Sequence, residues 1–292
     1  MNILFFALKT ILVSSILYGY YCLFLRNRAF SHYNRFFLLS IPFLSLLIPA
    51  LQLNVAGWDH SPAANPIRLL AVVNGHLDET FAGYGQQSFW KDLHWEPILL
   101  AATGLITLVL GFRLYRSLHY LMNLKRSTSP LSLEGARVYL VRAKGTPFSF
   151  FTSIFWNADQ DLTSADNHRI LQHELYHVCH RHSIDILLLE VLRTVCWFNP
   201  FIYLVRREIQ VVHEFLADAF AAGETDQLEY ARLLVTTRFR QPLSITHPFI
   251  QHSIKRRIAM ITRTSKTKPG LLGRIMIMPL LLLLTLLFAF KM

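Results

Sequence analysis

The chain reads NHRILQHELYHVCHRHSIDILLLEVLRT over residues 167–194 and FIYLVRREIQVVHEFLADAFAA over residues 201–222. Apolar residues recur at helical spacing in both stretches, and residues 163–166 offer capping side chains for the first. The connection Trp197-Phe198-Asn199-Pro200 ends the first helix, because proline ends a helix and restricts the residue before it. The sequence therefore predicts two long helices that fold back on one another, the second stopped by Gly223.

A histidine pair lies early in the first predicted helix, where residues 173–177 read His-Glu-Leu-Tyr-His. Positions i and i+4 share a helix face, so His173 and His177 can bind one Zn²⁺ at about 2.0–2.1 Å each. Glu174 is then placed to act as general base on water and later as acid to the leaving amine. Two surface histidines are the alternative interpretation. The predicted cap and the apolar continuation of the helix favour a metal site.

A catalytic zinc ion usually has three protein ligands, so a third is expected elsewhere. Glu190 follows His177 by thirteen residues, which puts it roughly 20 Å away along a continuous helix and excludes it. On the returning helix, Glu214 would lie within about two turns of His177. His213 is its neighbour, but adjacent helical residues point about 100° apart, so only one of the two can face the metal. We favour Glu214.

Two further side chains could support the ligands. Asp218 lies one turn beyond Glu214 and could accept a hydrogen bond from a ligand histidine, or it could be an ordinary solvated acid. His182 lies on a different helix face from the ligand pair and could support the site or simply be exposed, and His213 could also support it. These alternatives stay open at the level of sequence.

Four apolar blocks approach the roughly 20 residues that a helix needs to cross a bilayer, in a chain that is 53% hydrophobic. They are residues 3–25, 36–53, 97–115 and 271–290. Buried core helices are the alternative for each block. The first could also be a signal peptide, but it has no charged residue at its start and no small-residue cleavage site follows, so we expect a retained anchor.

The charges between the blocks predict an orientation. Residues 26–35 and the segment after the third block are basic, whereas residues 54–96 carry more acidic than basic side chains. Because Lys and Arg near membrane ends stay cytoplasmic, we expect both termini and the 54–96 loop outside a bacterial-type inner membrane, with residues 116–269 in the cytoplasm. The net charge of +11 is attributed to this topology and to lipid head groups, and no nucleic-acid-binding motif is evident.

The fold class expected is a mainly α membrane protein with four transmembrane helices and a cytoplasmic α+β metallopeptidase domain. Three transmembrane helices would occupy residues 1–115, the peptidase domain 116–270 and the fourth helix 271–292. Within the domain we predict a basic extension of the third transmembrane helix over residues 116–130. Strands are expected at 138–141 and 148–156, with further helices at 226–240 and 253–264. The second strand could bind an extended peptide along its edge or pack in the core.

The motif at 173–177, followed by Trp197-Phe198-Asn199-Pro200 and by residues 213–218 (His-Glu-Phe-Leu-Ala-Asp), resembles the membrane metallopeptidase family of the β-lactam sensor–transducers. Residues 147–150 (Pro-Phe-Ser-Phe) and the four-span layout are also similar. The zinc motif followed by Glu-x-x-x-Asp is shared with the CAAX prenyl proteases, so it indicates the larger gluzincin class. The resemblance implies three zinc ligands and one catalytic base, namely His173, His177, Glu214 and Glu174.

Members of that family are thought to cleave a cytoplasmic repressor, or themselves, when an outer sensor domain is acylated. Here Ser88-Phe89-Trp90-Lys91 matches the Ser-x-x-Lys spacing of such sensors. The surrounding loop of about 40 residues is below the usual size of a domain and lacks the companion Ser-Asp-Asn and Lys-Thr-Gly elements. We interpret the match as chance and expect any sensing to use the outer loop or a separate sensor protein.

The function expected is that of a zinc endopeptidase that cleaves a repressor, or itself, in regulated signalling. A constitutive peptidase for membrane-protein processing or quality control is one alternative. A non-catalytic membrane transducer is another, but Glu174 argues against it, because zinc binding alone does not need that residue.

Overall fold

The computed structural model describes residues 3–26, 31–51, 95–133, 135–143, 145–162, 164–223, 227–239, 247–261 and 277–288. Almost all of the predicted outer loop at 54–96, including Ser88 and Lys91, lies outside these residues, as does the expected connection to the last apolar block.

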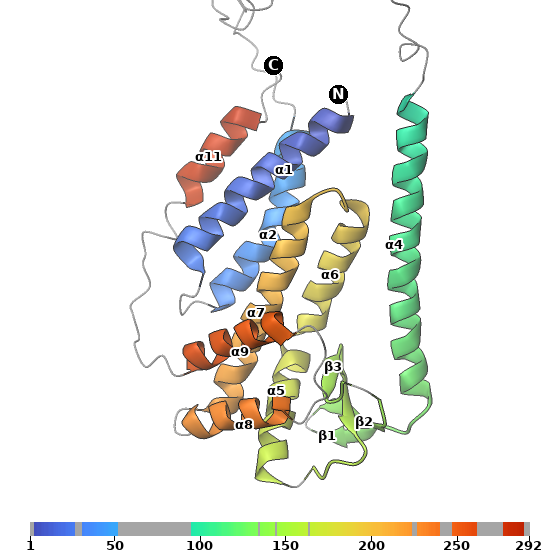
Figure 1. Cartoon of the computed structure of the whole chain (residues 1–292), viewed down its shortest axis with the longest axis vertical. Coiled ribbons are helices and arrows are strands. Elements are labelled where there is room, and N and C mark those ends of the chain that lie inside the picture. Colours follow the sequence, from blue (N-terminus) through green and yellow to red (C-terminus); the bar gives the residue numbers. More distant parts are fainter. Residues whose placement is uncertain are drawn as a thin grey trace, which may run out of the picture.

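Three helices are long and apolar enough to cross a membrane. They are α1 (Ile3–Tyr20), which continues as the π-helical turn η1 (Tyr21–Leu25), α2 (Ser31–Ala50) and α4 (Trp95–Arg126). Figure 1 shows α4 standing beside the rest of the protein, and none of its apolar window is buried. These helices indicate a membrane protein, and α4 includes most of the basic extension predicted beyond residue 115.

The fourth predicted span is only partly described. Its helix α11 (Ile277–Phe288) has 12 residues, about 18 Å of helix, against a hydrocarbon core of about 30 Å. Leu284 packs into the same core as α1 and α2. A fourth span and the orientation of the termini therefore remain predictions.

The prediction of a single helix over residues 167–194 is wrong, because the helical backbone is interrupted near its middle. It forms α5 (Ala165–Cys179) and α6 (His182–Val195), and between them Arg181 adopts a left-handed conformation with φ 54°. A non-glycine residue in that region turns the backbone out of the helical path. The returning helix α7 (Pro200–Ala222) is confirmed, and the Asn199 side chain caps it by accepting from Phe201 N at 3.0 Å.

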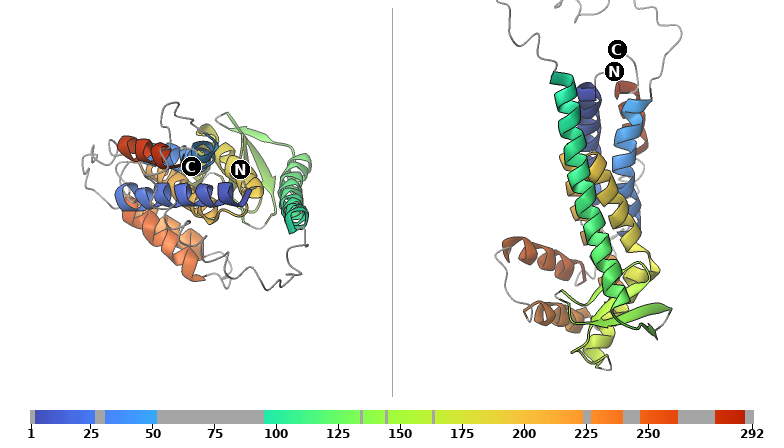
Figure 2. Two further views of the ribbon diagram at one scale, coloured as in Figure 1. Left: turned by 90° about the horizontal axis from the view of Figure 1, so that it is seen from above. Right: turned by 90° about the vertical axis from the view of Figure 1, so that its right-hand side faces the viewer.

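Helices α6 and α7 form a hairpin that rises between α4 on one side and α1 and α2 on the other (Figures 1 and 2). One buried core joins them to the membrane helices. It includes the following side chains: Val13, Leu17, Leu38, Ile41, Leu189, Val205 and Ile209.

The strand predicted at 148–156 is also wrong as one element. It forms β3 (Phe148–Phe150) and β4 (Ser153–Asn157), which pair antiparallel after a turn in which Phe151 has φ 53°. With β1 (Leu131–Leu133) and β2 (Ala136–Val141) they make a sheet of order β1-β2-β4-β3. Phe148 supports the alternative in which this strand packs in the core, because its ring stacks on that of Phe155 with the ring centroids 4.7 Å apart. The strand β3 is also an edge strand, and it lies against α5.

The last two helices of the predicted domain are present as α8 (Gln227–Phe239) and α9 (His247–Ile261). Figure 1 shows them lying across the end of the molecule opposite the chain termini. Both contact α7, so they close one side of the region between α5 and α7.

A buried carboxylate connects α9 to the first membrane helix. Glu208 of α7 accepts hydrogen bonds from Arg26 at 2.9 Å and from both terminal nitrogens of Arg256 at 3.0 Å. Its side chain is 4% exposed, and Tyr21 donates to it at 3.4 Å. Burying a carboxylate is costly unless it is paired, and here two guanidinium groups balance it.

We expect Glu208→Ala to destabilise the protein by about 3 kcal/mol, because two arginines lose the buried charge that balances them. The measurement is thermal unfolding of the detergent-solubilised chain. Glu229→Ala is the matched control. The Glu229 side chain is 63% exposed and pairs with Arg169, and such surface ion pairs contribute about 0–1 kcal/mol to stability. Equal shifts in the two variants would contradict the proposed role of Glu208.

Candidate metal centre

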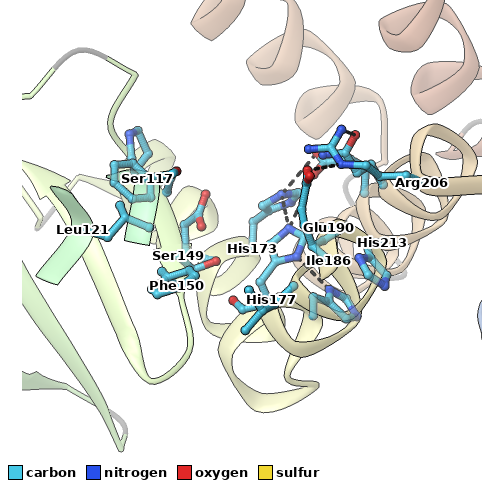
Figure 3. Close-up of a pocket in the computed structure, with 18 of the residues that line it drawn as sticks. Ser117, Leu121, Ser149, Phe150, His173, His177, Ile186, Glu190, Arg206 and His213 are labelled. Atoms are coloured by element: carbon cyan, nitrogen blue, oxygen red, sulfur yellow. Dashed lines mark hydrogen bonds and ion pairs between the residues drawn. The ribbon is translucent and has the colours of Figure 1, made fainter. Parts of the chain in front are cut away.

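The three predicted ligands converge. The Nε2 atoms of His173 and His177 lie 3.1 Å apart, and each is 3.7 Å from a different carboxylate oxygen of Glu214. One ligand atom from each residue can be chosen so that all three lie within 4.8 Å of one another. Figure 3 shows the two imidazoles turned toward each other on one face of α5. The antiparallel approach of α7 to α5 supplies the glutamate.

The outer nitrogen of His173 faces a buried acid. Its Nδ1 lies 3.2 Å from Asp218 Oδ1, and the carboxylate is 0% exposed. Tyr230 of α8 donates to the same oxygen at 3.0 Å, and Arg257 of α9 donates to both carboxylate oxygens, at 2.5 and 2.7 Å. A carboxylate behind a ligand histidine fixes its tautomer and leaves Nε2 for the metal. Asp218 is therefore no ordinary solvated acid.

The outer nitrogen of His177 faces a second chain of contacts. Its Nδ1 lies 2.7 Å from His182 Nδ1, and the His182 ring stacks on His213 with centroids 3.9 Å apart. His213 Nε2 in turn lies 2.9 Å from Asp185, which also accepts from Arg35 of α2 at 2.5 Å. His182 is thus a buried neighbour of a ligand rather than an exposed residue. His213 faces away from the ligand atoms, while Glu214 faces them.

The donor set fits zinc. Two imidazole nitrogens and one carboxylate oxygen are the combination that zinc peptidases use, and zinc at such sites takes three protein ligands with one position open. Each histidine has its second nitrogen directed to a partner other than the metal, as metal-ligating histidines almost always do.

Glu174 follows the first ligand and lies in a low-dielectric setting. The residue is only 8% exposed to solvent. Burial raises the pKa of the Glu174 carboxyl and the nearby Glu214 adds to this effect, whereas His173 and a hydrogen bond from Ser149 of β3 act in the opposite direction. A raised pKa brings a carboxylate closer to the range in which a general base is efficient.

Glu214 has an additional partner that the sequence did not reveal. Arg257 Nη1 lies 2.9 Å from Glu214 Oε2. Burial alone would raise the pKa of the Glu214 carboxyl, but Arg257 and His173 outweigh burial and lower it. The carboxylate is therefore held in the ionised form that a metal ligand requires.

The site opens into a cavity of about 910 Å³. Its walls include Ser149 and Phe150 of β3 and Ser117 and Leu121 of α4, and at the hairpin Glu190 lies beside Arg206 (Figure 3). Glu190, which the sequence excludes as a ligand, pairs with Arg193 and Arg206. A cavity of this size is comparable to ordinary ligand pockets and gives Glu174 access to a bound molecule.

Sequence reasoning did not find Ser149 in contact with Glu174, nor Tyr230 and Arg257 around Asp218. Arg257 belongs to the basic run Lys255-Arg256-Arg257, which on its own is typical of a solvated helix face. Only the packing of α9 on α7 reveals that two of these arginines enter buried ion pairs.

We expect His173→Ala, His177→Ala and Glu214→Ala each to lose bound zinc, because each removes one of three ligand groups. His213→Ala should keep zinc, since its ring is directed to Asp185. Elemental analysis of the purified, metal-loaded variants measures this. Full zinc content in Glu214→Ala together with loss in His213→Ala would show that the ligand assignment is wrong.

Asp218→Asn is expected to weaken zinc binding about 10–100-fold, because the negative charge behind His173 is lost while the ligands remain. Competition with a chromogenic chelator gives the affinity. Asp159→Asn is the control, because this acid is 62% exposed and pairs only with Arg142 among the described contacts. Unchanged affinity in Asp218→Asn would contradict a role in orienting His173.

A search among curated proteins found no match for this chain. A family model does match part of it. The matched segment, residues 153–261, contains the three candidate ligands, Glu174, Asp218 and Arg257. The similarity inferred from the histidine motif is thereby confirmed over this segment. The matching model is that of the family described as BlaR1 peptidase M56, and the match covers residues 153–261.

Proposed function

We propose that the protein is a membrane-bound zinc endopeptidase that hydrolyses peptide bonds on the cytoplasmic side of the membrane. The observation that carries the proposal is the convergence of His173, His177 and Glu214 beside a buried Glu174. The family match over residues 153–261 supports a metallopeptidase, and the three apolar helices support a membrane location. The cytoplasmic placement follows from the charge pattern alone.

Glu174 would carry the proton transfers. Its carboxylate takes a proton from the attacking water as the oxygen bonds to the carbonyl carbon, and it then delivers that proton to the departing amine nitrogen. A bound zinc ion would polarise the carbonyl and lower the pKa of water toward about 7. Ser149 of β3 forms a hydrogen bond with this carboxylate.

The edge strand β3 offers a way to hold an extended substrate. It carries no strand partner on its outer side among the described residues, and Phe148 to Phe150 line the cavity with Glu174. A peptide added to this edge would gain backbone hydrogen bonds and present its carbonyl groups along the cavity. This arrangement favours an unfolded or extended segment over a folded surface.

The biological role proposed is regulated signalling proteolysis, with a transcriptional repressor or the chain itself as substrate. The resemblance to the sensor–transducers supports this role, and a separate sensor protein would provide the stimulus. A constitutive processing or quality-control peptidase has the same chemistry and differs in the number of substrates. A non-catalytic transducer would not need the buried acid at position 174.

Glu174→Gln should abolish peptide hydrolysis, with a loss of at least about 10²-fold, while zinc content and thermal stability stay unchanged. Gln keeps the shape of the side chain but cannot accept the proton. Cleavage is measured on reconstituted protein with a quenched peptide library, and Glu229→Gln serves as control. Retained hydrolysis in Glu174→Gln would exclude the assigned base.

The same inactive variant can trap substrates in cells, which distinguishes the two roles. Recovery of one DNA-binding repressor supports signalling. Recovery of many misfolded membrane proteins supports quality control and contradicts the signalling role.

A further inference from the structure

The tip of the α6–α7 hairpin is fixed to the middle of a membrane helix. Asn199 Nδ2 donates to Ser14 Oγ at 2.8 Å, and the two residues are 0% and 1% exposed. Ser14 lies next to the midpoint of the candidate span Phe5–Leu25. Arg26 lies twelve positions further along the chain, which corresponds to roughly 18 Å of helix. The hairpin tip therefore lies about halfway through the layer that α1 crosses.

A second contact places the end of α6 against another apolar helix on the other side. A Cβ atom built on Gly111 of α4 would lie 3.9 Å from Thr194 Cγ2 of α6. Gly111 belongs to the candidate span Pro97–Arg126. The end of α6 thus lies between two helices that are each apolar enough to cross a membrane, as Figures 1 and 2 also show.

The outward face of α6 carries no polar side chain at the positions that are most exposed. Ile184, Leu188, Val191 and Val195 follow one another at spacings of four, three and four residues, so they form a single stripe. Their exposed fractions are 43%, 36%, 45% and 60%. In water such a contiguous apolar stripe would be a liability, whereas against lipid it is the expected surface.

The charges of the hairpin are arranged as they are inside membranes. Residues 190–206, which run from Glu190 to the tip and back to its partner Arg206, contain only three charged side chains, Glu190, Arg193 and Arg206. Glu190 pairs with both arginines. Charged groups at membrane depth are rare and usually paired, facing the protein interior.

Two backbone N–H groups of the turn are satisfied within the protein. Cys196 N donates to Leu192 O at 2.8 Å, and Asn199 N donates to Cys196 O at 3.0 Å. Both residues are buried. Non-helical backbone is tolerated at membrane depth only where it is enclosed by protein in this way or lines a water-filled cavity.

We propose that residues 190–206 form a re-entrant hairpin inserted in the bilayer, with Val191 and Val195 of the apolar stripe in contact with lipid acyl chains and Leu188 at the edge of this region. This differs from the arrangement expected from sequence, in which residues 116–269 lie wholly in the cytoplasm. The cavity of the metal centre extends along this hairpin, since Leu110 and Leu114 of α4 and Thr194 of α6 line it. The proposal does not depend on catalytic activity.

Spin labels on the full chain in phospholipid vesicles test the proposal. After Cys22, Cys179 and Cys196 are replaced by alanine, single cysteines are introduced by Leu188→Cys, Val191→Cys and Val195→Cys. Leu105→Cys, 64% exposed on α4, is the lipid-facing control, and Leu228→Cys, 72% exposed on α8, is the aqueous control. Collision rates with oxygen and with a water-soluble nickel chelate are compared.

The expected result is an oxygen-to-nickel ratio at positions 191 and 195 that matches position 105, with a smaller ratio at 188. A ratio like that at position 228 would mean that the stripe faces water and would overturn the proposal. Low collision with both reagents would mean that another protein covers the stripe, which would also overturn it.

A second comparison does not need labelling. Val195→Lys should lower the thermal stability of the vesicle-embedded protein or block its insertion, because the new charge would lie near mid-membrane. Leu228→Lys should leave both unchanged. If Val195→Lys is as well tolerated as Leu228→Lys, the hairpin is not in the bilayer.

Discussion

The antiparallel contact between α5 and α7 is the constraint on which the rest of the site depends. It brings Glu214 opposite His173 and His177, and it buries Asp218 behind His173. Two carboxylates so close together would repel each other in a low-dielectric interior. Arg257 of α9 contacts both and balances their charge, so the packing of α9 on α7 contributes to the geometry of the ligands.

The membrane helices contribute directly to this arrangement. Arg35 of α2 holds Asp185, which orients His213 beneath the His182 ring, and His182 contacts the ligand His177. On the other side, Arg26 and Arg256 share Glu208, and Arg256 is adjacent to Arg257. Both ligand histidines are therefore connected, through few contacts, to the ends of membrane helices. The metal centre and the transmembrane part form one packed unit rather than a domain on a tether.

Where the sequence prediction was wrong, the cause was a local backbone event without a strong sequence signal. Arg181 adopts a left-handed conformation between α5 and α6, although arginine is a good helix former and the apolar pattern continues past it. Phe151 does the same between β3 and β4, inside a run of aromatic residues that favours a strand. Neither position is glycine or asparagine, the residues that usually indicate such turns. Tertiary contacts, such as Phe151 N with Ser183 Oγ at 2.9 Å, accompany these conformations.

The amino-acid sequence by itself determined the histidine pair, the adjacent acid, the returning helix and the apolar blocks, because each can be recognised within one segment of the chain. It narrowed the candidates for the third metal ligand to two neighbouring residues, His213 and Glu214. Only the tertiary structure decided between the directions of His213 and Glu214, and only it revealed Ser149, Tyr230 and Arg257 at the site. The physical reason is that these contacts join segments far apart in the chain, and their geometry depends on how helices pack. Helical spacing fixes which residues share a face, but not what that face meets.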